Sequence, residues 1–523
     1  MNTIEFIPSP QQQALFDWVR DGRGSANVIA VAGAGKTTSI LTAVQMMHGN
    51  IFVGAYNKKI AEESGLRLQA MGADMRRVRS GTMHSAGFAA WRNTAKGVRV
   101  DDKKTCGIVN DLIVAENLPK GQGIAAYADF IPKAVSLAKQ SAFGLLCDYR
   151  NPVAWYGIIE HFGLDDELDA GHDIARGIQY CISVYEISLG MDKEVIDFDD
   201  MILAPLVHKA RFWQQDWVLI DEAQDTNPAR RALARAMLKP GGRLIAVGDP
   251  RQAIFGFTGA DADSMDLIKA DFNCIELPLT VSYRCPKAVV AHAQQWVSHI
   301  EAHPTALDGV VRTMPLTRLL EQAGAVHAFL DDEWPALSKD DAILCRNTKP
   351  LVELAYGLIR LGVACQVEGR DIGLGLIKLA RKWRCTGLEA LLGKLALYKG
   401  QECAKLAAKG KEQQAAAIED RVETLICMAE VCQTQGKHNI TDLVSFIERL
   451  FGDTKDGDRP RVLTLSTVHK SKGREWDKVY LLGRNKYMPS KWARKAWQQE
   501  QEDNLCYVAV TRAKRELIEI MVD

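Results

Sequence analysis

The sequence predicts an α/β protein with two parallel sheets, each interrupted by helices. Short apolar runs typical of buried strands occur in two groups, and each run is followed by polar or helical sequence. The first group is residues 27–32, 51–56, 217–221 and 243–248, and the second is residues 341–345, 461–467 and 478–482. Strands that alternate with helices favour parallel sheets. Helix-rich stretches with few strand signals lie near residues 90–195 and 375–455.

These patterns divide the chain of 523 residues into six consecutive segments, and a chain of this length has room for three or four domains. The predicted segments are residues 1–90, 91–195, 196–275, 276–374, 375–458 and 459–523. The first and third segments form one α/β domain, and the second is a helical insertion in it. The fourth and sixth form another α/β domain. The fifth is a short helical insertion, rich in residues of high helix propensity.

Charge balance, cysteine spacing and the N-terminal sequence limit the classes to which the protein can belong. The 65 basic and 65 acidic residues cancel, so a surface that binds nucleic acid has to be local. The 12 cysteines contain no Cys-x-x-Cys pair, which predicts reduced thiols in a cytoplasmic protein. The N-terminus lacks the pattern of a signal peptide, and no apolar run reaches the roughly 18 residues of a membrane span.

A glycine-rich loop follows the first predicted strand and opens a helix, in the sequence AVAGAGKT at residues 30–37. Glycines allow backbone N–H groups to approach a triphosphate, and the start of a helix adds positive potential. The residues expected to hold ATP are Ala32, Gly33, Ala34, Gly35, Lys36, Thr37 and Thr38. Lys36 would reach the β- and γ-phosphates, and the Thr37 hydroxyl would ligate Mg²⁺. Ala30 stands where the general motif has glycine.

A second candidate site is the acidic sequence DEAQD, which directly follows the apolar run at 217–221. A carboxylate at the end of a strand can hold Mg²⁺ directly or through water, the role predicted for Asp221. Glu222 is then placed to polarise the attacking water as a general base. Alone, such a motif is also consistent with a solvated turn; beside a phosphate loop, it predicts a nucleotide hydrolase.

The combination of AxAGxGKT and DEAQD resembles the ATPase core of the UvrD/Rep-type superfamily-one helicases. Further motifs occur in the order of that family over nearly the whole chain. The resemblance implies two RecA-like P-loop domains with helical insertions, ATP and Mg²⁺ as cofactors, and ATP-dependent 3′→5′ DNA helicase activity on single-stranded and forked DNA. It also implies that Gln11 reads adenine, with Gln12 as the alternative.

The same resemblance implies which residues contact nucleic acid. They are Asn57 and Lys58 in AYNK, Thr82 and His84 in GTMHS, Phe255 and Phe257 in GDPRQAIFGFTGA, and Thr467 and His469 in TVHKSKGREW. Small polar side chains at strand ends suit contacts to phosphate and sugar. The two phenylalanines would stack on bases, worth about 1–3 kcal/mol per base. A segment at 197–201, DFDDM, resembles the sequence that leads into the family's acidic strand.

The resemblance also assigns catalytic and nucleotide-binding roles beyond the first sheet. Gln252 would sense the γ-phosphate, Tyr283 would stack on adenine, and Glu475 would accept the ribose hydroxyls. Arg284 and Arg512 would stabilise charge on the γ-phosphate, and an arginine finger is worth about 10³–10⁵ in rate. Both sheets would then have to face one ATP, so that binding closes a cleft and hydrolysis opens it.

Several other classes of protein are alternatives to a helicase. A GTPase, kinase or metabolic ATPase lacks the second-sheet arginines. A scaffold without ATPase activity would have lost Lys36, Glu222 or Arg512, and all three are present. A fused nuclease has no room at either end, although a nuclease or a replication or repair partner on another chain stays open. A DNA-dependent ATPase that remodels complexes without unwinding is the nearer rival, because the second insertion is short.

Overall fold

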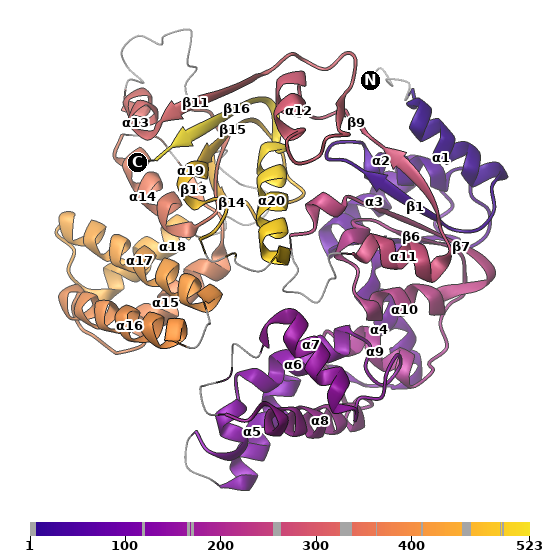
Figure 1. Cartoon of the computed structure of the whole chain (residues 1–523), viewed down its shortest axis with the longest axis horizontal. Coiled ribbons are helices and arrows are strands. Elements are labelled where there is room, and N and C mark those ends of the chain that lie inside the picture. Colours follow the sequence, from indigo (N-terminus) through magenta and orange to yellow (C-terminus); the bar gives the residue numbers. More distant parts are fainter. Residues whose placement is uncertain are drawn as a thin grey trace. The chain divides into compact units, whose positions relative to one another are not determined.

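The structure is a computed structural model, and it forms two units, Met1–Thr280 and Val281–Asp523. It describes residues 7–117, 121–164, 168, 172–254, 263–324, 337–361, 363, 365–408, 412–451, 462–491, 493 and 496–522. Each unit contains its own parallel sheet covered by helices (Figure 1). The two α/β domains with helical insertions are therefore present. The division falls after Thr280 and not at 275/276, because strand β8 (Ile275–Leu279) pairs with the first sheet.

The first unit contains the phosphate loop and the acidic motif. Its elements are α1 (Pro10–Asp21), β1 (Ala26–Ala30), α2 (Lys36–Val44), β2 (Ile51–Ala55), α3 (Lys58–Ala70), β3 (Val78–Thr82), α4 (Met83–Thr94), β4 (Arg99–Val100), α5 (Lys104–Glu116), the 3-10 helix η1 (Gly123–Tyr127), α6 (Phe130–Gln140), α7 (Pro152–Phe162), α8 (Ile174–Gly190), β5 (Val195–Ile196), α9 (Asp200–Val207), β6 (Gln215–Ile220), η3 (Ala223–Asp225), α10 (Pro228–Met237), β7 (Leu238–Gly248), η4 (Pro250–Gln252), α11 (Ser264–Phe272) and β8.

The sheet of this unit has the order β3-β2-β6-β7-β1-β8, and every pairing in it is parallel. Strand β2, nearly all of β6 and the last five residues of β7 are buried, as expected for apolar strands covered on both faces. Because all strands run the same way, their carboxyl ends meet at one edge of the sheet. The ends of β6, β7 and β1 are neighbours there, and the ends of β2 and β3 follow on one side.

Helices α5 to α8 form the predicted insertion of the first unit, grouped apart from the sheet in Figure 1. One continuous apolar core joins them to the sheet, from Trp155 and Tyr185 in the insertion to Phe52 and Met83 near the strands. Tyr185 is fully buried, and its hydroxyl donates to the backbone oxygen of Phe143 at 2.7 Å. The insertion is therefore packed as part of the first unit.

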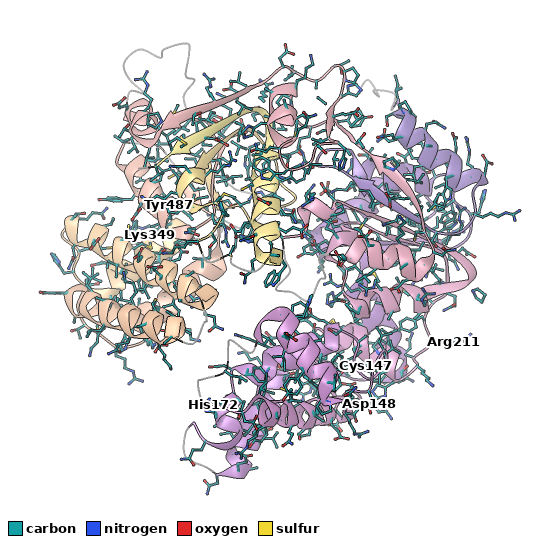
Figure 2. The ribbon with its side chains drawn as sticks, in the orientation of Figure 1. Cys147, Asp148, His172, Arg211, Lys349 and Tyr487 are labelled. Atoms are coloured by element: carbon teal, nitrogen blue, oxygen red, sulfur yellow. The ribbon has the colours of Figure 1, made fainter. Side chains whose placement is uncertain are left out.

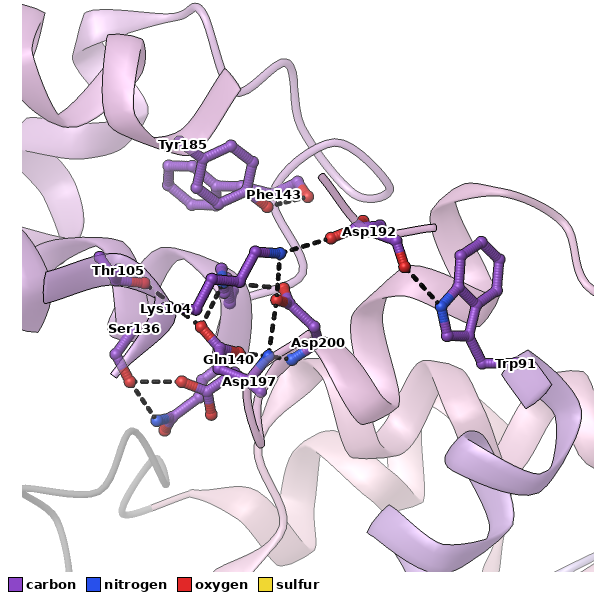
Figure 3. A network of polar contacts seen from close by, with 12 residues as sticks. Trp91, Lys104, Thr105, Ser136, Gln140, Phe143, Tyr185, Asp192, Asp197 and Asp200 are labelled. Atoms are coloured by element: carbon purple, nitrogen blue, oxygen red, sulfur yellow. Dashed lines mark hydrogen bonds and ion pairs between the residues drawn. The ribbon is translucent and has the colours of Figure 1, made fainter. Parts of the chain in front are cut away.

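A buried network of charges also attaches the insertion (Figure 3). Lys104 of α5 lies 2.8 Å from Asp192 and 2.7 Å from Asp200. Lys139 of α6 lies 2.6 Å from Asp197 and 2.8 Å from Asp200. Both lysine side chains are 0% exposed. Three of these residues flank or belong to the DFDDM segment before α9, so buried ion pairs hold the insertion against that segment.

The second unit contains the remaining motifs. Its elements are β9 (Val281–Ser282), α12 (Lys287–Ala293), β10 (Glu301–Ala302), β11 (Val310–Pro315), α13 (Leu316–Gly324), β12 (Ala342–Cys345), α14 (Thr348–Arg360), β13 (Cys365–Val367), α15 (Arg370–Arg381), α16 (Leu388–Ala408), α17 (Glu412–Thr434), α18 (Ile440–Phe451), β14 (Leu463–Thr467), β15 (Trp476–Leu482), α19 (Arg484–Tyr487), α20 (Ala496–Val510) and β16 (Ala513–Met521).

The second sheet has the order β11-β16-β15-β12-β14-β13 and is also parallel. Helices α15 to α18 form the predicted second insertion. Asp420 of α17 accepts hydrogen bonds from the backbone N–H groups of Thr348 and Lys349, and so caps α14 beside the sheet. The Lys349 side chain, labelled with Tyr487 in Figure 2, donates to Glu423 of α17 at 2.6 Å.

The twelve cysteines are free thiols; Cys106 is exposed, and the others are buried or partly buried. No described helix combines the length and the apolar character that crossing a membrane requires.

The buried network predicts an unequal response of two adjacent lysines. Lys104→Met removes the buried lysine partner of Asp192 and one of the two lysine partners of Asp200, which should lower the free energy of unfolding by about 3–5 kcal/mol. Lys103, its exposed neighbour, is the control, and Lys103→Met should change stability by less than about 0.5 kcal/mol. Urea denaturation followed by tryptophan fluorescence measures both changes. Equal stabilities of the two variants would show that the network does not anchor the insertion.

Candidate functional site

The phosphate loop connects β1 to α2 at the carboxyl edge of the first sheet. Gly33 and Gly35 both have φ of 75°, a left-handed conformation that favours glycine. A Cβ on Gly35 would also lie only 3.3 Å from the Gln12 side chain. No side chain among the described residues caps α2, which leaves the start of the helix open to an anion. The loop therefore has the backbone that a phosphate cradle requires.

Lys36, the first residue of α2, has an incompletely satisfied ammonium group. Its Nζ atom is buried and has no hydrogen-bond partner in the described part of the chain. The nearest carboxylate oxygen, Oε2 of Glu222, is 3.8 Å away, and the lysine side chain is 11% exposed. A buried cation without hydrogen bonds is costly, so this atom is positioned to bind an anionic ligand.

The acidic residues lie beside this lysine at the end of β6. The Thr37 hydroxyl donates to Oδ2 of Asp221 at 3.0 Å, and the backbone N–H of Glu222 donates to Oδ1 at 2.9 Å. Burial, and then the neighbouring Glu222 carboxylate, raise the pKa of Asp221 to about 6. Two adjacent carboxylates with one nearby lysine thus form an electronegative site.

Gln224 links this acid pair to the end of β7, a role that the sequence reasoning did not assign. Its amide donates to Oε2 of Glu222 at 2.5 Å and accepts from the backbone N–H of Asp249 at 3.0 Å. Gln252 then donates to Oδ2 of Asp249 at 2.7 Å. Gly248 provides the necessary space, because a Cβ there would lie 2.5 Å from the Gln224 oxygen. The predicted base and the predicted phosphate sensor therefore belong to one hydrogen-bonded chain.

The donor set fits a magnesium ion bound together with a triphosphate. Asp249 is a third carboxylate near Lys36; it is 3% exposed, and burial raises its pKa. No cluster of three or more His, Cys, Asp or Glu side chains in the described residues could hold a metal alone. Mg²⁺ is usually held by one or two carboxylates, with phosphate and water completing its shell. Thr37 and Asp221 are suitably placed to be the few protein ligands of such an ion.

Near the start of the chain, the two candidate adenine-reading glutamines are both engaged with the protein. Gln11 donates to the Thr280 hydroxyl at 2.9 Å and accepts from the Thr280 backbone N–H at 2.7 Å. Gln12 is buried, forms a capping box with Ser9 at the start of α1, and donates to Ser39 at 2.9 Å. Adenine reading by Gln11 stays a prediction, and it requires exchange of the Thr280 contacts.

Four residues that are predicted to contact nucleic acid lie at the carboxyl ends of β2 and β3. Strand β2 is the neighbour of β6 in the sheet. Asn57 and Thr82 cap α3 and α4 by accepting backbone N–H groups. The Lys58 side chain is 88% exposed. Burial, and then the charge of Arg230, lower the pKa of His84 to about 4, so this histidine is neutral at pH 7. The other two candidates in this unit, Phe255 and Phe257, lie outside the described residues.

The second unit brings two of its predicted nucleotide contacts together. Oε2 of Glu475 lies 2.5 Å from Nε of Arg284. Tyr283 is 41% exposed, and its ring lies against that of His303, with centroids 4.8 Å apart and an angle of 32° between the planes. His303 was not identified from the sequence; its backbone N–H donates to Ser282 and thereby fixes it beside the tyrosine.

Arg512 differs from the expectation of a projecting arginine. It is 1% exposed, and its guanidinium donates to the backbone oxygens of Val508 and Arg474 and to the Thr511 hydroxyl. In this structure it is a packed residue at the junction of α20 and β16. An arginine-finger role stays a prediction, and it requires that these hydrogen bonds change.

Thr467 and His469 lie at and just after the carboxyl end of β14 in the second unit. Thr467 is 9% exposed, and its backbone oxygen accepts from the N–H groups of Lys470 and Ser471. Burial, and then the charge of Arg346, lower the pKa of His469 to about 3. A contact from His469 to a nucleic acid would therefore be a hydrogen bond from a neutral ring.

Known proteins with similar sequences are helicases by name. ATP-dependent DNA helicase UvrD2 of Mycobacterium tuberculosis is 24% identical over 94% of this chain and 76% of that protein. SRS2 of Saccharomyces cerevisiae is 29% identical over 47% of the chain and 23% of that protein. Rep of Salmonella typhimurium is 25% identical over 53% of the chain and 41% of that protein. The chain thus spans well under half of two of these relatives.

Family models match most of the first unit and the C-terminal part of the second. A model of the UvrD/REP helicase N-terminal domain matches residues 10–273, which include the phosphate loop, the acidic motif and the first insertion. A model of the UvrD-like helicase C-terminal domain matches residues 388–523, which include β14 to β16. The first match alone covers half of the chain. The chain therefore belongs to the UvrD/Rep family of helicases.

Proposed function

We propose that the chain is an ATP-dependent DNA helicase that moves along single-stranded DNA in the 3′→5′ direction. The observation that carries this proposal is the ammonium group of Lys36, which is buried beside the Asp221–Glu222 pair and has no hydrogen-bond partner among the described residues. Helicase relatives and the polar residues at the ends of β2 and β3 support DNA as the track. The free cysteine thiols suit a cytoplasmic enzyme.

In the proposed mechanism, residues of the first unit bind ATP and activate the attacking water. Lys36 and the backbone of the loop would hold the β- and γ-phosphates, while Thr37 and Asp221 would hold Mg²⁺. The ion would neutralise charge on the phosphates and orient them. Glu222 orients the attacking water and accepts its proton. Gln224 positions Glu222 through the 2.5 Å hydrogen bond between their side chains.

Movement on DNA requires that the state of the nucleotide reaches the DNA-binding residues. Gln252 would contact the γ-phosphate, and Phe255 and Phe257, the proposed stacking residues, follow it within five positions. Loss of the γ-phosphate would therefore act on the stacking residues through a short stretch of backbone. Arg284 and Arg512 of the second RecA-like domain would add positive charge to the transition state, so that hydrolysis opens the two domains.

A second candidate is a DNA-dependent ATPase that displaces proteins from DNA or serves a nuclease or repair partner without processive unwinding. The observation in its favour is the modest second insertion, helices α15 to α18 within residues 370–451. Separating each base-pair step costs about 1.4 kcal/mol on average, so processive unwinding requires an element that splits the duplex. The two candidates share the same motor and differ only in duplex separation.

ATP hydrolysis with and without single-stranded DNA tests the proposed motor, and forked duplexes with one 3′ or one 5′ tail test unwinding and direction. We expect strong stimulation by DNA and unwinding only from the 3′ tail. Lys36→Met should abolish hydrolysis but not DNA binding, whereas Lys394→Met on the surface of α16 should alter neither. Stimulated hydrolysis without unwinding supports the second candidate; hydrolysis unaffected by DNA contradicts both.

The role of Gln224 generates a separate prediction at Gly248. In Gly248→Ala the new Cβ collides with the side chain and the backbone nitrogen of Gln224, at 2.5 and 3.0 Å. Displacement of Gln224 releases Glu222, so we expect kcat for ATP to fall about tenfold or more, with a smaller change in KM. Gly107→Ala, at an open position of α5 where φ is likewise not positive, is the control. An unchanged kcat would show that Gln224 does not position the base.

A further inference from the structure

A small polar cavity in the first unit is separate from the nucleotide site and has a volume of about 90 Å³. It is lined by His84, Lys139, Gln140, Asp199, Ile202, Asn227, Ala229 and Arg230. These residues come from four separate segments: the start of α4, the end of α6, residues 199–202 at the start of α9, and the start of α10 with its cap. The volume equals that of roughly three water molecules and is smaller than the ~150 Å³ of a cavity that holds benzene. It therefore suits the edge of a ring and not a whole ring.

Arg230, one of the residues that line this cavity, has a donor without a partner among the described residues. Its Nη1 donates to the backbone oxygen of Asp225 at 2.9 Å, but its Nε atom is buried and has no hydrogen-bond partner among the described residues. Burial lowers the pKa of Arg230, although an arginine stays charged at neutral pH. A buried N–H without a partner costs about 1–3 kcal/mol, so a ligand with an acceptor would relieve this cost.

Two other residues that line the cavity, Gln140 and Asp199, carry acceptors. The Ser136 hydroxyl donates to Oδ2 of Asp199 at 2.5 Å, so its oxygen must accept the 3.1 Å hydrogen bond from Nε2 of Gln140 (Figure 3). This arrangement fixes the orientation of the Gln140 amide, whose Oε1 is buried and unpartnered among the described residues. Among the described residues, Asp199 forms no ion pair with a lysine, unlike Asp197 and Asp200.

The other three polar residues of the cavity do not alter this balance. The Asn227 side chain accepts a hydrogen bond from the backbone N–H of Arg230 and caps α10. The ammonium of Lys139 is already held by Asp197 and Asp200. His84 is neutral at pH 7 because its pKa is lowered. One guanidinium therefore faces one carboxylate and one amide oxygen. Two acceptors disfavour a phosphate, and the mixed lining is complementary to a neutral group that carries a donor next to an acceptor.

We propose that this cavity binds the edge of one unpaired nucleobase of single-stranded DNA, with Arg230 donating to the base and Asp199 and Gln140 accepting from it. The inference rests on the proposed function, and it adds a base contact to the expected backbone contacts of Thr82 and His84. Base edges carry adjacent donors and acceptors, and only unpaired bases present their Watson–Crick edges. The cavity therefore selects single-stranded over duplex DNA.

Equilibrium binding of two probes, a thymidine oligonucleotide and an abasic oligonucleotide of equal length, tests this assignment. Arg230→Gln should weaken binding of the thymidine probe about three- to tenfold and leave the abasic probe unchanged. The salt dependence of binding should keep its slope, whereas loss of a phosphate contact would reduce the slope by about 0.7. Arg235→Gln, an exposed arginine on the same helix, is the control and should behave as the wild type.

Gln140→Leu and Asp199→Asn remove acceptors without removing the arginine, and thermal unfolding checks that each variant folds. Selective weakening of the thymidine probe by all three variants supports the base site. An equal loss for both probes, a reduced salt slope, or no change in any folded variant overturns it. If the wild type binds neither probe and DNA does not stimulate its ATP hydrolysis, the proposed function itself fails, and so this failure is distinct from that of the base site.

Discussion

The first unit is organised around one imbalance of charge. Lys36 is the buried cation beside three carboxylates, Asp221, Glu222 and Asp249, and its ammonium has no hydrogen bond in the described chain. Burial disfavours the charged form of the Asp221 carboxylate, and the neighbouring Glu222 repels a second negative charge. Both effects raise the pKa of Asp221. Mg²⁺ would neutralise the acids, and a triphosphate would satisfy the lysine. The added phosphate charge then requires further cations, the role proposed for Arg284 and Arg512.

The geometry of a parallel sheet brings these charged residues together. Strands β1, β7 and β6 are adjacent, so the loop, the turn before Gln252 and the acid pair meet although they are distant in the sequence. Gln224 then joins two of these strand ends by hydrogen bonds. The insertion is attached by Lys104 and Lys139, which are paired with buried aspartates. Removal of one partner from a buried ion pair is costly, and Lys139, which is paired in this way, also lines the cavity beside Arg230.

Motifs with strong local signals were predicted well from the sequence. The phosphate loop, the acidic strand end and both helical insertions have unmistakable patterns of glycine, acid or helix propensity. Strand β3, with the sequence VRSGT, was missed because it is short and polar, and its place depends on pairing with β2. The burial of Lys104 could not be foreseen, because lysine in a helix is ordinarily exposed and its partners are about ninety positions away. The packing of Arg512 likewise depends on tertiary contacts.

The affinity of a slowly hydrolysed ATP analogue, measured in Mg²⁺ and again in EDTA, tests the charge imbalance most directly. Without the metal, the phosphates face three carboxylates, so the wild type should bind the analogue at least tenfold more weakly in EDTA. In Asp221→Asn one repulsive charge and one metal ligand are lost, and this ratio should approach one. Equal affinities of the wild type in Mg²⁺ and EDTA would contradict the account.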